Sequence, residues 1–249
     1  MADYGVDLQR RGKIAVVTFN RPRKKNSLDE HMWSCIEKVA GDLWKSLPRA
    51  VILTGAGDEA FCSGFDVNPE NPQVTRLAEA VQNRRKAPAM ELIRRIRTAA
   101  DRLVCLPVPV IAAVNGLAYG GGAEIASRCD LRVMDPGAVF CFSEVKLGLM
   151  PDHGGVVGLT RLVGPSKAAD LILTGRKVGA GEALALGLVS RISAPGKALE
   201  EALELAGAIA ENGPHAVRHA LKVIRRTPDL TCDQALALET LEAVDLIAS

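Results

Sequence analysis

The sequence predicts an α/β fold with a helical C-terminal region, from three observations along its 249 residues. Short β-branched apolar runs, bounded by turn residues, alternate with longer amphipathic stretches, which is typical of strands alternating with helices. After about residue 196 the pattern becomes mostly helical. A chain of this length can bury a substantial hydrophobic core. We therefore expect an α/β core over residues 1–195 and a helical region over 196–249.

The expected strands are the short apolar runs, several of which lead into a loop and then a helix. They cover residues 13–19, 50–55, 108–116, 131–135, 138–143 and 188–193.

The expected helices follow from capping residues and amphipathic spacing. The stretch 27–44 begins with Ser27 and has Glu30 three residues later, which is a capping-box pattern. The stretch 73–104 is charged and permits a helix, although Pro88 should break or kink it. Two further helices are expected at 165–175 and 180–187.

Composition excludes several classes of protein. Hydrophobic residues make up 48% of the chain and its formal net charge is +2, as in ordinary globular proteins. This charge implies no general attraction to nucleic acid or to an anionic membrane. No apolar run is long enough to span a membrane, and the first residues resemble no targeting segment. The six cysteines form no Cys-x-x-Cys pair, so we expect free thiols in the cytoplasm and no metal site.

The stretch AVNGLAYGGGAEIASRCD (113–130) places three consecutive glycines shortly before Glu124. Glycine lets a backbone N–H approach a ligand without a Cβ between them. If a helix begins near Gly121, its first N–H groups lack partners inside the helix and can stabilise a developing oxyanion. The alternative is a tight turn or close helix–strand packing without a ligand, and the glycines alone favour that alternative.

A second glycine loop, GAGDEAFCSGFDV (55–67), follows another expected buried strand. It could present the Phe65 N–H toward the same pocket as the Gly121 N–H. Two such donors converging on one oxygen would form an oxyanion hole.

Four motifs now stand in order along the chain: NRPRKKNSL (20–28), AFCSGFDV (60–67), the glycine run, and FSEVKLGLMPDHGG (142–155). Together they resemble the crotonase superfamily, the enoyl-CoA hydratase/isomerase family, over residues 6–226. The resemblance implies a spiral of ββα units and a C-terminal helical region that assembles homotrimers, often paired as hexamers. It also implies an acyl-CoA thioester substrate, of which CoA is a part, and no other cofactor or metal.

The resemblance implies roles for particular residues. The N–H groups of Phe65 and Gly121 would hold the thioester oxygen. Glu124 would orient and deprotonate a water molecule, and Glu144 would exchange a proton at Cα, giving syn addition of water to a 2-enoyl-CoA. Without the motif, Glu144 would be interpreted as a glutamate in a surface salt bridge.

Asp152 leaves the type of reaction open, because hydratases similar to this family usually have glycine there. An aspartate at this position occurs in dienoyl-CoA isomerases and carnitinyl-CoA dehydratases of the superfamily. It could orient a catalytic glutamate, move a proton between carbons, or simply cap a helix. The neighbouring His153 could contact substrate, but a lone histidine in a turn is more often a polar surface or capping residue. The alternatives to a hydratase are therefore an enoyl- or dienoyl-CoA isomerase using Asp152, or a CoA-thioester-binding protein without turnover.

The CoA moiety is expected near basic side chains of the first motif. Arg23, Lys24 and Lys25 suit its phosphates, and Gly64 and Asp66 match positions where the family contacts CoA. The three basic residues are equally compatible with a solvated charged turn. The lysine that often follows the aspartate is absent, since residues 67 and 68 are Val and Asn.

Overall fold

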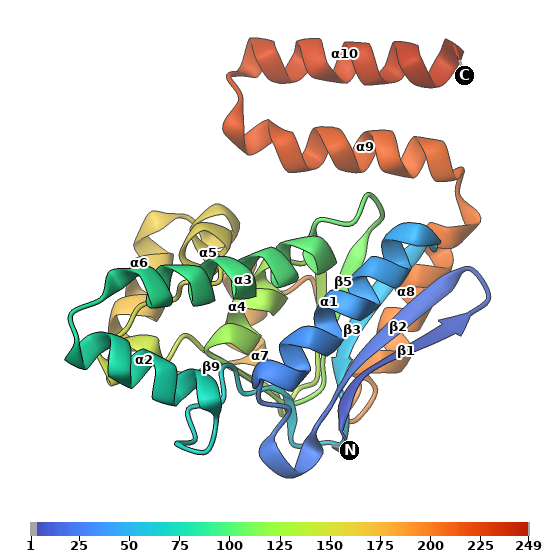
Figure 1. Cartoon of the computed structure of the whole chain (residues 1–249). Helices are drawn as coiled ribbons and strands as arrows, with labels where there is room; N and C mark the ends of the chain where they lie inside the picture. Colours follow the sequence, from blue (N-terminus) through green and yellow to red (C-terminus); the bar gives the residue numbers. More distant parts are fainter. Residues whose placement is uncertain (1–3, 249) are drawn as a thin grey trace.

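The computed structural model describes residues 4–248 of the chain (Figure 1). Within them, the larger β-sheet has the strand order β1-β2-β3-β5-β7-β10. The first pairing, β1 with β2, is antiparallel, and all later pairings in this sheet are parallel. The strands are β1 (Gly5–Arg11), β2 (Ile14–Asn20), β3 (Ala50–Gly55), β5 (Val110–Val114), β7 (Leu131–Met134) and β10 (Arg191–Ile192).

A smaller sheet has the order β4-β6-β8-β9 among the described residues. Its first three strands are parallel, and β9 pairs antiparallel with β8. These strands are β4 (Ala60–Cys62), β6 (Leu117–Tyr119), β8 (Val139–Cys141) and β9 (Val178–Gly179).

Helices cover both sheets and form the C-terminal region. The α-helices are α1 (Glu30–Lys45), α2 (Pro72–Gln82), α3 (Lys86–Val104), α4 (Gly121–Arg128), α5 (Gly155–Val163), α6 (Pro165–Thr174), α7 (Ala180–Ala185), α8 (Ala198–Glu211), α9 (Pro214–Arg226) and α10 (Cys232–Ala248). Short 3₁₀ turns are η1 (Pro22–Lys24), η2 (Glu144–Leu147) and η3 (Thr227–Asp229). The predicted α/β class with a helical C-terminal region is confirmed.

Successive ββα units place one strand in each sheet. β3 and β4, β5 and β6, and β7 and β8 are consecutive pairs, and each pair is followed by helix. Because β4, β6 and β8 are parallel neighbours, their carboxyl ends meet at one edge of the smaller sheet. Ligands of parallel sheets commonly bind at such an edge.

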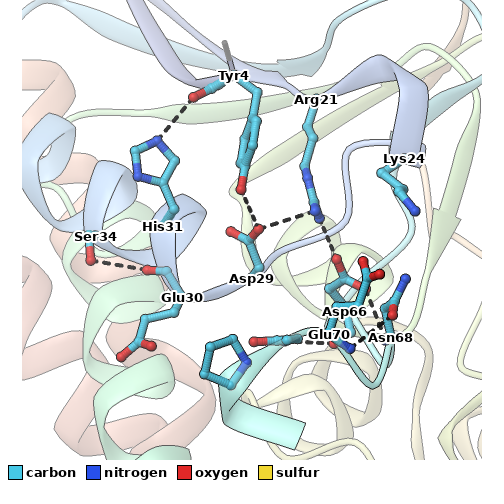
Figure 2. A pocket seen from close by; sticks show the side chains of 12 residues that line it. Tyr4, Arg21, Lys24, Asp29, Glu30, His31, Ser34, Asp66, Asn68 and Glu70 are labelled. Carbon is cyan, nitrogen blue, oxygen red and sulfur yellow. Dashed lines mark hydrogen bonds and ion pairs between the residues drawn. The ribbon is translucent and has the colours of Figure 1, made fainter. Parts of the chain in front are cut away.

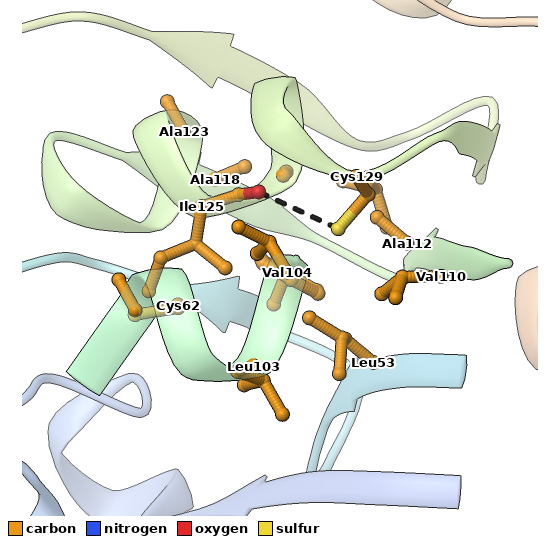
Figure 3. Close-up of a cluster of buried hydrophobic side chains, with 14 of the residues drawn as sticks. Leu53, Cys62, Leu103, Val104, Val110, Ala112, Ala118, Ala123, Ile125 and Cys129 are labelled. Carbon is orange, nitrogen blue, oxygen red and sulfur yellow. Dashed lines mark hydrogen bonds between the residues drawn. The ribbon is translucent and has the colours of Figure 1, made fainter. Parts of the chain in front are cut away.

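Alternation along the strands divides the core into two layers. Val51, Leu53 and Ala112 face the main hydrophobic cluster, where Leu103 and Val104 of α3 and Ile125 of α4 pack around them (Figure 3). The intervening strand residues face the opposite side and pack against Ala202 and Ala206 of α8. The central strands are therefore buried on both faces, as their continuous apolar runs predict.

The expected elements agree with the structure in position, with two corrections. Helix α1 is capped by Asp29, whose side chain accepts the Met32 N–H, so the expected capping box on Ser27 is wrong. The break in 73–104 lies at residues 83–85, and Pro88 lies inside the first turn of α3, where its missing N–H costs no helical hydrogen bond.

The C-terminal helices do not form a separate layer. Helix α8 packs against β3, β5 and β7, whereas α9 and α10 form a hairpin that stands away from the sheets (Figure 1). The division at residue 195/196 stays a prediction, but the helices that project from the core begin at Pro214.

Among the described helices, none combines the length and apolar character needed to cross a bilayer.

Candidate active site

The two glycine loops meet at the carboxyl ends of β4 and β6. A Cβ added to Gly64 would lie 2.8 Å from the Gly121 nitrogen, so the loops are in contact. A Cβ on Gly122 would lie 2.0 Å from the carbonyl oxygen of Cys62, which excludes any larger residue there. Gly120 has a φ of 50° and leads the chain from β6 into α4. The glycines therefore provide both the close packing and the exposed backbone that the sequence left as alternatives.

The backbone around Phe65 is held by a bridge to Leu28. The Leu28 N–H donates to the Gly64 carbonyl at 2.8 Å, and the Asp66 N–H donates to the Leu28 carbonyl at 3.0 Å. Within residues 4–248, the Phe65 and Gly121 N–H groups donate to no protein acceptor. Gly121 is also the first residue of α4, where the helix dipole concentrates positive charge. Both N–H groups, on loops that touch at Gly64 and Gly121, are thus free of protein acceptors.

Glu124 is a buried carboxyl, 1% exposed, on the first turns of α4. Its Oε2 accepts the N–H groups of His153 at 2.7 Å and Gly155 at 2.8 Å. A Cβ on Gly155 would lie 2.4 Å from Glu124 Cγ, so the start of α5 packs directly on this side chain. Burial, reinforced by the nearby Glu144 charge, raises the pKa of Glu124 to about 8.

Glu144 lies close to Glu124 and belongs to η2, after the carboxyl end of β8. Its Oε1 is 3.5 Å from the position that a Gly120 Cβ would occupy. Both carboxyl oxygens are buried and have no hydrogen-bond partner among the described residues. Burial raises the pKa of this carboxyl as well. The interpretation of Glu144 as a surface ion pair is therefore wrong.

His153 is buried between two acids, only 5% exposed. Its Nδ1 lies 3.6 Å from Glu124 Oε1, and its Nε2 lies 3.1 Å from Asp152 Oδ1. Trp33 of α1 packs edge-on against the ring, with centroids 5.5 Å apart. Burial, followed by the charge of Arg128, lowers the pKa of His153 to about 4, so the ring is neutral. The interpretation of His153 as a polar surface residue is wrong.

Asp152 is partly exposed and does not cap α5. The N-cap position is Gly154, which has no side chain, and the N–H of Gly155 at this helix end is accepted by Glu124 rather than by Asp152. Burial raises the pKa of Asp152. The capping alternative is therefore wrong, and Asp152 lies at the solvent side of the acid cluster.

The cluster could also be considered as a cation site, since donor atoms of Glu124, Asp152 and His153 lie within 4.8 Å of one another. However, Oε2 of Glu124 already accepts two backbone N–H groups. Its raised pKa also favours the neutral acid near pH 7, which is a poor ligand for a cation. The two backbone hydrogen bonds to Glu124 and its raised pKa therefore argue against a cation at this cluster.

The three basic residues of the first motif do not lie together. Lys24 lines a polar cavity of about 510 Å³ beside the loop that follows β4, together with Arg21, Asp66 and Asn68 (Figure 2). Arg23 and Lys25 instead line a hollow of about 230 Å³. Lys25 also lies 4.0 Å from Glu59. Only Lys24 therefore reaches the larger cavity.

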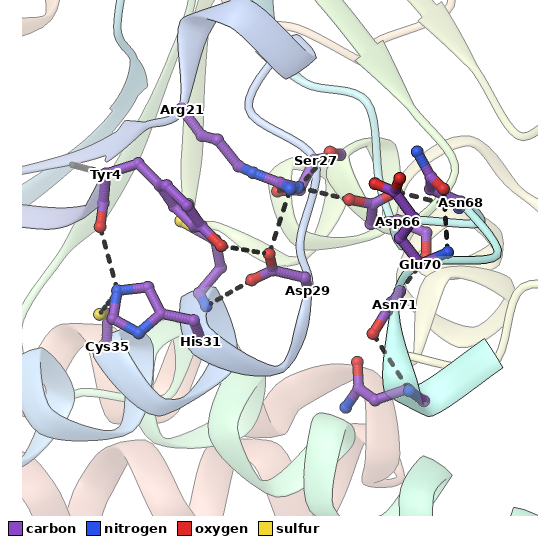
Figure 4. Close-up of polar contacts among 12 residues, drawn as sticks. Tyr4, Arg21, Ser27, Asp29, His31, Cys35, Asp66, Asn68, Glu70 and Asn71 are labelled. Atoms are coloured by element: carbon purple, nitrogen blue, oxygen red, sulfur yellow. Dashed lines mark hydrogen bonds and ion pairs between the residues drawn. The ribbon is translucent and has the colours of Figure 1, made fainter. Parts of the chain in front are cut away.

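The Asp66 carboxylate is hydrogen-bonded to other groups of the protein. It accepts the Arg21 guanidinium at 2.5 Å and the Asn68 N–H at 3.0 Å. Arg21 also pairs with Asp29, which accepts the Tyr4 hydroxyl (Figure 4). Although burial pushes the pKa of Asp66 upward, the Arg21 hydrogen bond holds it below the ordinary value. Sequence reasoning assigned no role to Arg21, although this residue lies within the first motif.

The chain is similar to known proteins over nearly its whole length. The sequence profile described as "Enoyl-CoA hydratase/isomerase" matches residues 9–248. A short-chain-enoyl-CoA hydratase of Clostridium acetobutylicum is 39% identical over 236 residues, which cover 94% of this chain and 86% of that protein. A carnitinyl-CoA dehydratase of Salmonella arizonae is 34% identical, over 91% of this chain and 82% of the relative.

Solved structures are similar over nearly the whole chain. The crystal structure of an enoyl-CoA hydratase from Bacillus anthracis superposes with a TM-score of 0.87 at 32% identity. The match covers 98% of this chain and 91% of the other.

Proposed function

Since this chain belongs to the enoyl-CoA hydratase/isomerase family, we propose that it adds water to the double bond of a 2-enoyl-CoA thioester, or removes water in the reverse direction. The observation that carries this proposal is the convergence of Glu124 and Glu144 beside the free N–H groups of Phe65 and Gly121. Two acids and a pair of backbone donors are what hydration of an activated double bond requires.

The backbone donors would stabilise charge on the thioester oxygen. When water attacks Cβ, the π electrons move toward Cα and the carbonyl, and the oxygen becomes enolate-like. Hydrogen bonds from Phe65 and Gly121 would strengthen as that charge develops. One such donor is typically worth about 3–4 kcal/mol of barrier.

The two glutamates would complete the proton transfers. Glu124 takes a proton from the attacking water as the C–O bond forms, and Glu144 gives a proton to Cα. Elimination reverses both transfers. Because the two carboxyls influence each other's ionisation, the pair holds one proton as a coupled unit. Burial favours this arrangement, since it disfavours two adjacent negative charges.

Isomerisation of an enoyl- or dienoyl-CoA is the second candidate, and one observation favours it. Asp152 is a third acid with a raised pKa, in contact with His153 beside Glu124. Moving a proton from one carbon to another requires acids at different points along the acyl chain. The third alternative, CoA-thioester binding without turnover, is less favoured because it gives no role to two buried carboxyls.

We further propose that the protein works as a homotrimer or hexamer and needs no cofactor beyond the CoA of its substrate. Lys24 and the polar cavity beside Asp66 suit the CoA moiety. Acyl groups of the fatty acid type fit the proposed chemistry.

The test uses crotonyl-CoA and the loss of enoyl-thioester absorbance. We expect Glu124→Gln and Glu144→Gln each to lower kcat by about 10²–10⁴-fold, the usual contribution of a positioned acid or base. Glu91→Gln, on α3, is the matched control and should retain activity. Binding of CoA thioesters of several chain lengths, without any change in absorbance, would contradict the hydratase proposal. A shift of the double bond that depends on Asp152 would favour the isomerase.

A further inference from the structure

His153 holds a buried nitrogen with no hydrogen-bond partner among the described residues. This atom, Nδ1, faces Glu124 Oε1 at 3.6 Å and would lie 2.7 Å from a Cβ on Gly121. A buried polar atom without a partner is costly, so its position calls for an explanation. The proposed reaction assigns this side chain no step.

The contacts of the two acids decide where the protons lie. Asp152 Oδ1 lies 3.1 Å from Nε2, so an ionised Asp152 favours the ring tautomer with its proton on Nε2. Nδ1 then carries a lone pair and no proton, so it can only accept a hydrogen bond. Glu124 Oε2 already accepts two backbone N–H groups, so the proton of neutral Glu124 belongs on Oε1, the oxygen that faces Nδ1.

We propose that Asp152, His153 and Glu124 form a hydrogen-bonded triad, in which Asp152 holds the ring proton on Nε2 and Nδ1 accepts the Oε1–H of neutral Glu124. The distance of 3.6 Å is slightly longer than a hydrogen bond. Catalytic hydrogen bonds are often long without substrate and shorten in the complex. Asp152 and His153 are positioning residues, since both act through Glu124.

The surroundings of the ring support the neutral form. Trp33 of α1 covers one edge. Arg128 of α4 donates to the His153 carbonyl at 2.7 Å and pairs with Asp101 of α3, so its positive charge opposes protonation of the ring. Glu144 of η2 adds negative charge next to Glu124 and favours a proton there. Glu144 also competes with His153 as an acceptor of the Glu124 proton, because the two carboxyl groups interact directly.

The triad decides which carboxyl carries the shared proton, and this consequence rests on the proposed function. With the proton held on Glu124, Glu144 is ionised and can take a proton from Cα, while Glu124 can protonate a leaving hydroxyl. This is the protonation state for removal of water from a 3-hydroxyacyl thioester. Hydration proceeds from the state in which the proton has moved to Glu144.

The test is ¹⁵N NMR of histidine-labelled protein without substrate, with ¹³C-carboxyl glutamate to follow Glu124. His153 and Glu124 are assigned by difference from His153→Ala and Glu124→Gln. Between pH 6 and 8 we expect the Nε2 atom of His153 to carry a proton and its Nδ1 atom to carry none. Asp152→Asn should give the Nδ1–H tautomer a measurable population. It should also lower the Glu124 midpoint, the pH at which half of the Glu124 carboxyl groups are ionised, by about one pH unit. His153→Ala should lower that midpoint as well.

Asp233→Asn, which removes an exposed acid on α10, is the control and should change neither signal. An Nδ1–H tautomer in the unaltered protein, or a Glu124 midpoint unmoved by Asp152→Asn, would overturn the triad. Binding of Zn²⁺ at micromolar concentration with a shift of the His153 signals would do so too, because the cluster would then be a cation site.

A kinetic measurement then connects the triad to turnover. Asp152→Asn should move the kcat/KM profile against pH for crotonyl-CoA in the same direction as the Glu124 midpoint, with KM changed less than kcat. If the NMR result holds and no turnover of any enoyl-CoA is found, the triad stands and the proposed function fails.

Discussion

At the scale of single residues, Glu124 shows how packing changes the ionisation of one carboxyl. The unfolded chain ionises this group near pH 4.5, whereas burial raises its pKa to about 8 in the folded state. Between these values the folded state binds more protons than the unfolded state. The free energy of unfolding must therefore fall as the pH rises through this window, and level off above it.

The fall in the free energy of unfolding with rising pH predicts how Glu124→Gln changes stability. Glutamine keeps an oxygen to accept the His153 and Gly155 N–H groups and cannot ionise. We expect the variant to gain stability relative to the unaltered protein as the pH rises from 5 to 8, on the order of 3 kcal/mol in total. Urea unfolding at several pH values measures it. Glu91→Gln should show no such trend, and a constant difference for Glu124→Gln across the window would contradict the prediction.

The residues of the site differ in how far the sequence could predict them. Glu124, Glu144, Phe65 and Gly121 come from motifs, and the structure brings them to one edge of the smaller sheet. The burial of His153 could not be predicted, because it arises where the segment before α5 lies against Trp33 of α1 and Glu124 of α4. Those helices lie far apart in the sequence, and one chain carries no signal for their contact.

At the scale of elements, the proposed oxyanion hole depends on how closely α4 approaches β4. The Gly122 position leaves no room for a side chain, because the Cys62 carbonyl oxygen would lie 2.0 Å from its Cβ. The backbone of β4 cannot move without displacing Phe65. The glycine run is thus primarily a packing device, and the free N–H groups are its consequence.

Gly122→Ala tests this coupling. We expect a loss of more than about 3 kcal/mol in the free energy of unfolding, since overpacking against backbone is relieved only by moving an element. Gly181→Ala on α7 is the matched control, because a Cβ there meets nothing within 4 Å, and it should gain up to about 1 kcal/mol. Chemical denaturation measures both. Equal stability of the two variants would contradict the packing argument.

The loop after β4 is also held from its other side by Arg21. This guanidinium bridges Asp66 and Asp29, and thereby joins the loop to the N-terminus of α1 (Figure 4). Arg21→Met leaves two largely buried carboxylates without their cation, and should cost about 3 kcal/mol. Arg23→Met, in the exposed turn η1, should cost less than about 0.5 kcal/mol. Thermal unfolding of the two variants measures the difference in their stability. Similar melting temperatures would show that Arg21 does not anchor the loop.

The elements that the sequence predicted are the long apolar or amphipathic ones. Strand β1 was missed, because its sequence GVDLQRR holds only two large apolar side chains among polar and charged ones. The strands β4, β6 and β9 were not predicted, since runs of two or three residues are too short to show a period. They nevertheless form the sheet that carries the site. Their pairing depends on neighbours far along the chain, which a local pattern does not contain.

At the scale of the whole molecule, the hairpin of α9 and α10 has apolar side chains without a partner in the described chain. They are Ile224, Leu236, Leu241, Val244 and Ile247, which are 56–86% exposed. A cluster of exposed apolar residues on a projecting element is typical of a protein–protein interface. This surface supports the proposed assembly into trimers or hexamers.

The last prediction tests that assembly. We expect sedimentation or light scattering to give the mass of three or six 26.4 kDa chains. Leu241→Glu with Val244→Glu places two charges on the exposed face of α10 and should shift the protein to monomers, because desolvating them would cost more than the contact gains. Lys13→Glu, in the exposed turn between β1 and β2, is the charge control and should leave the mass unchanged. A monomer in the unaltered protein would contradict the proposal, and the apolar face of the hairpin would then have to serve a different partner.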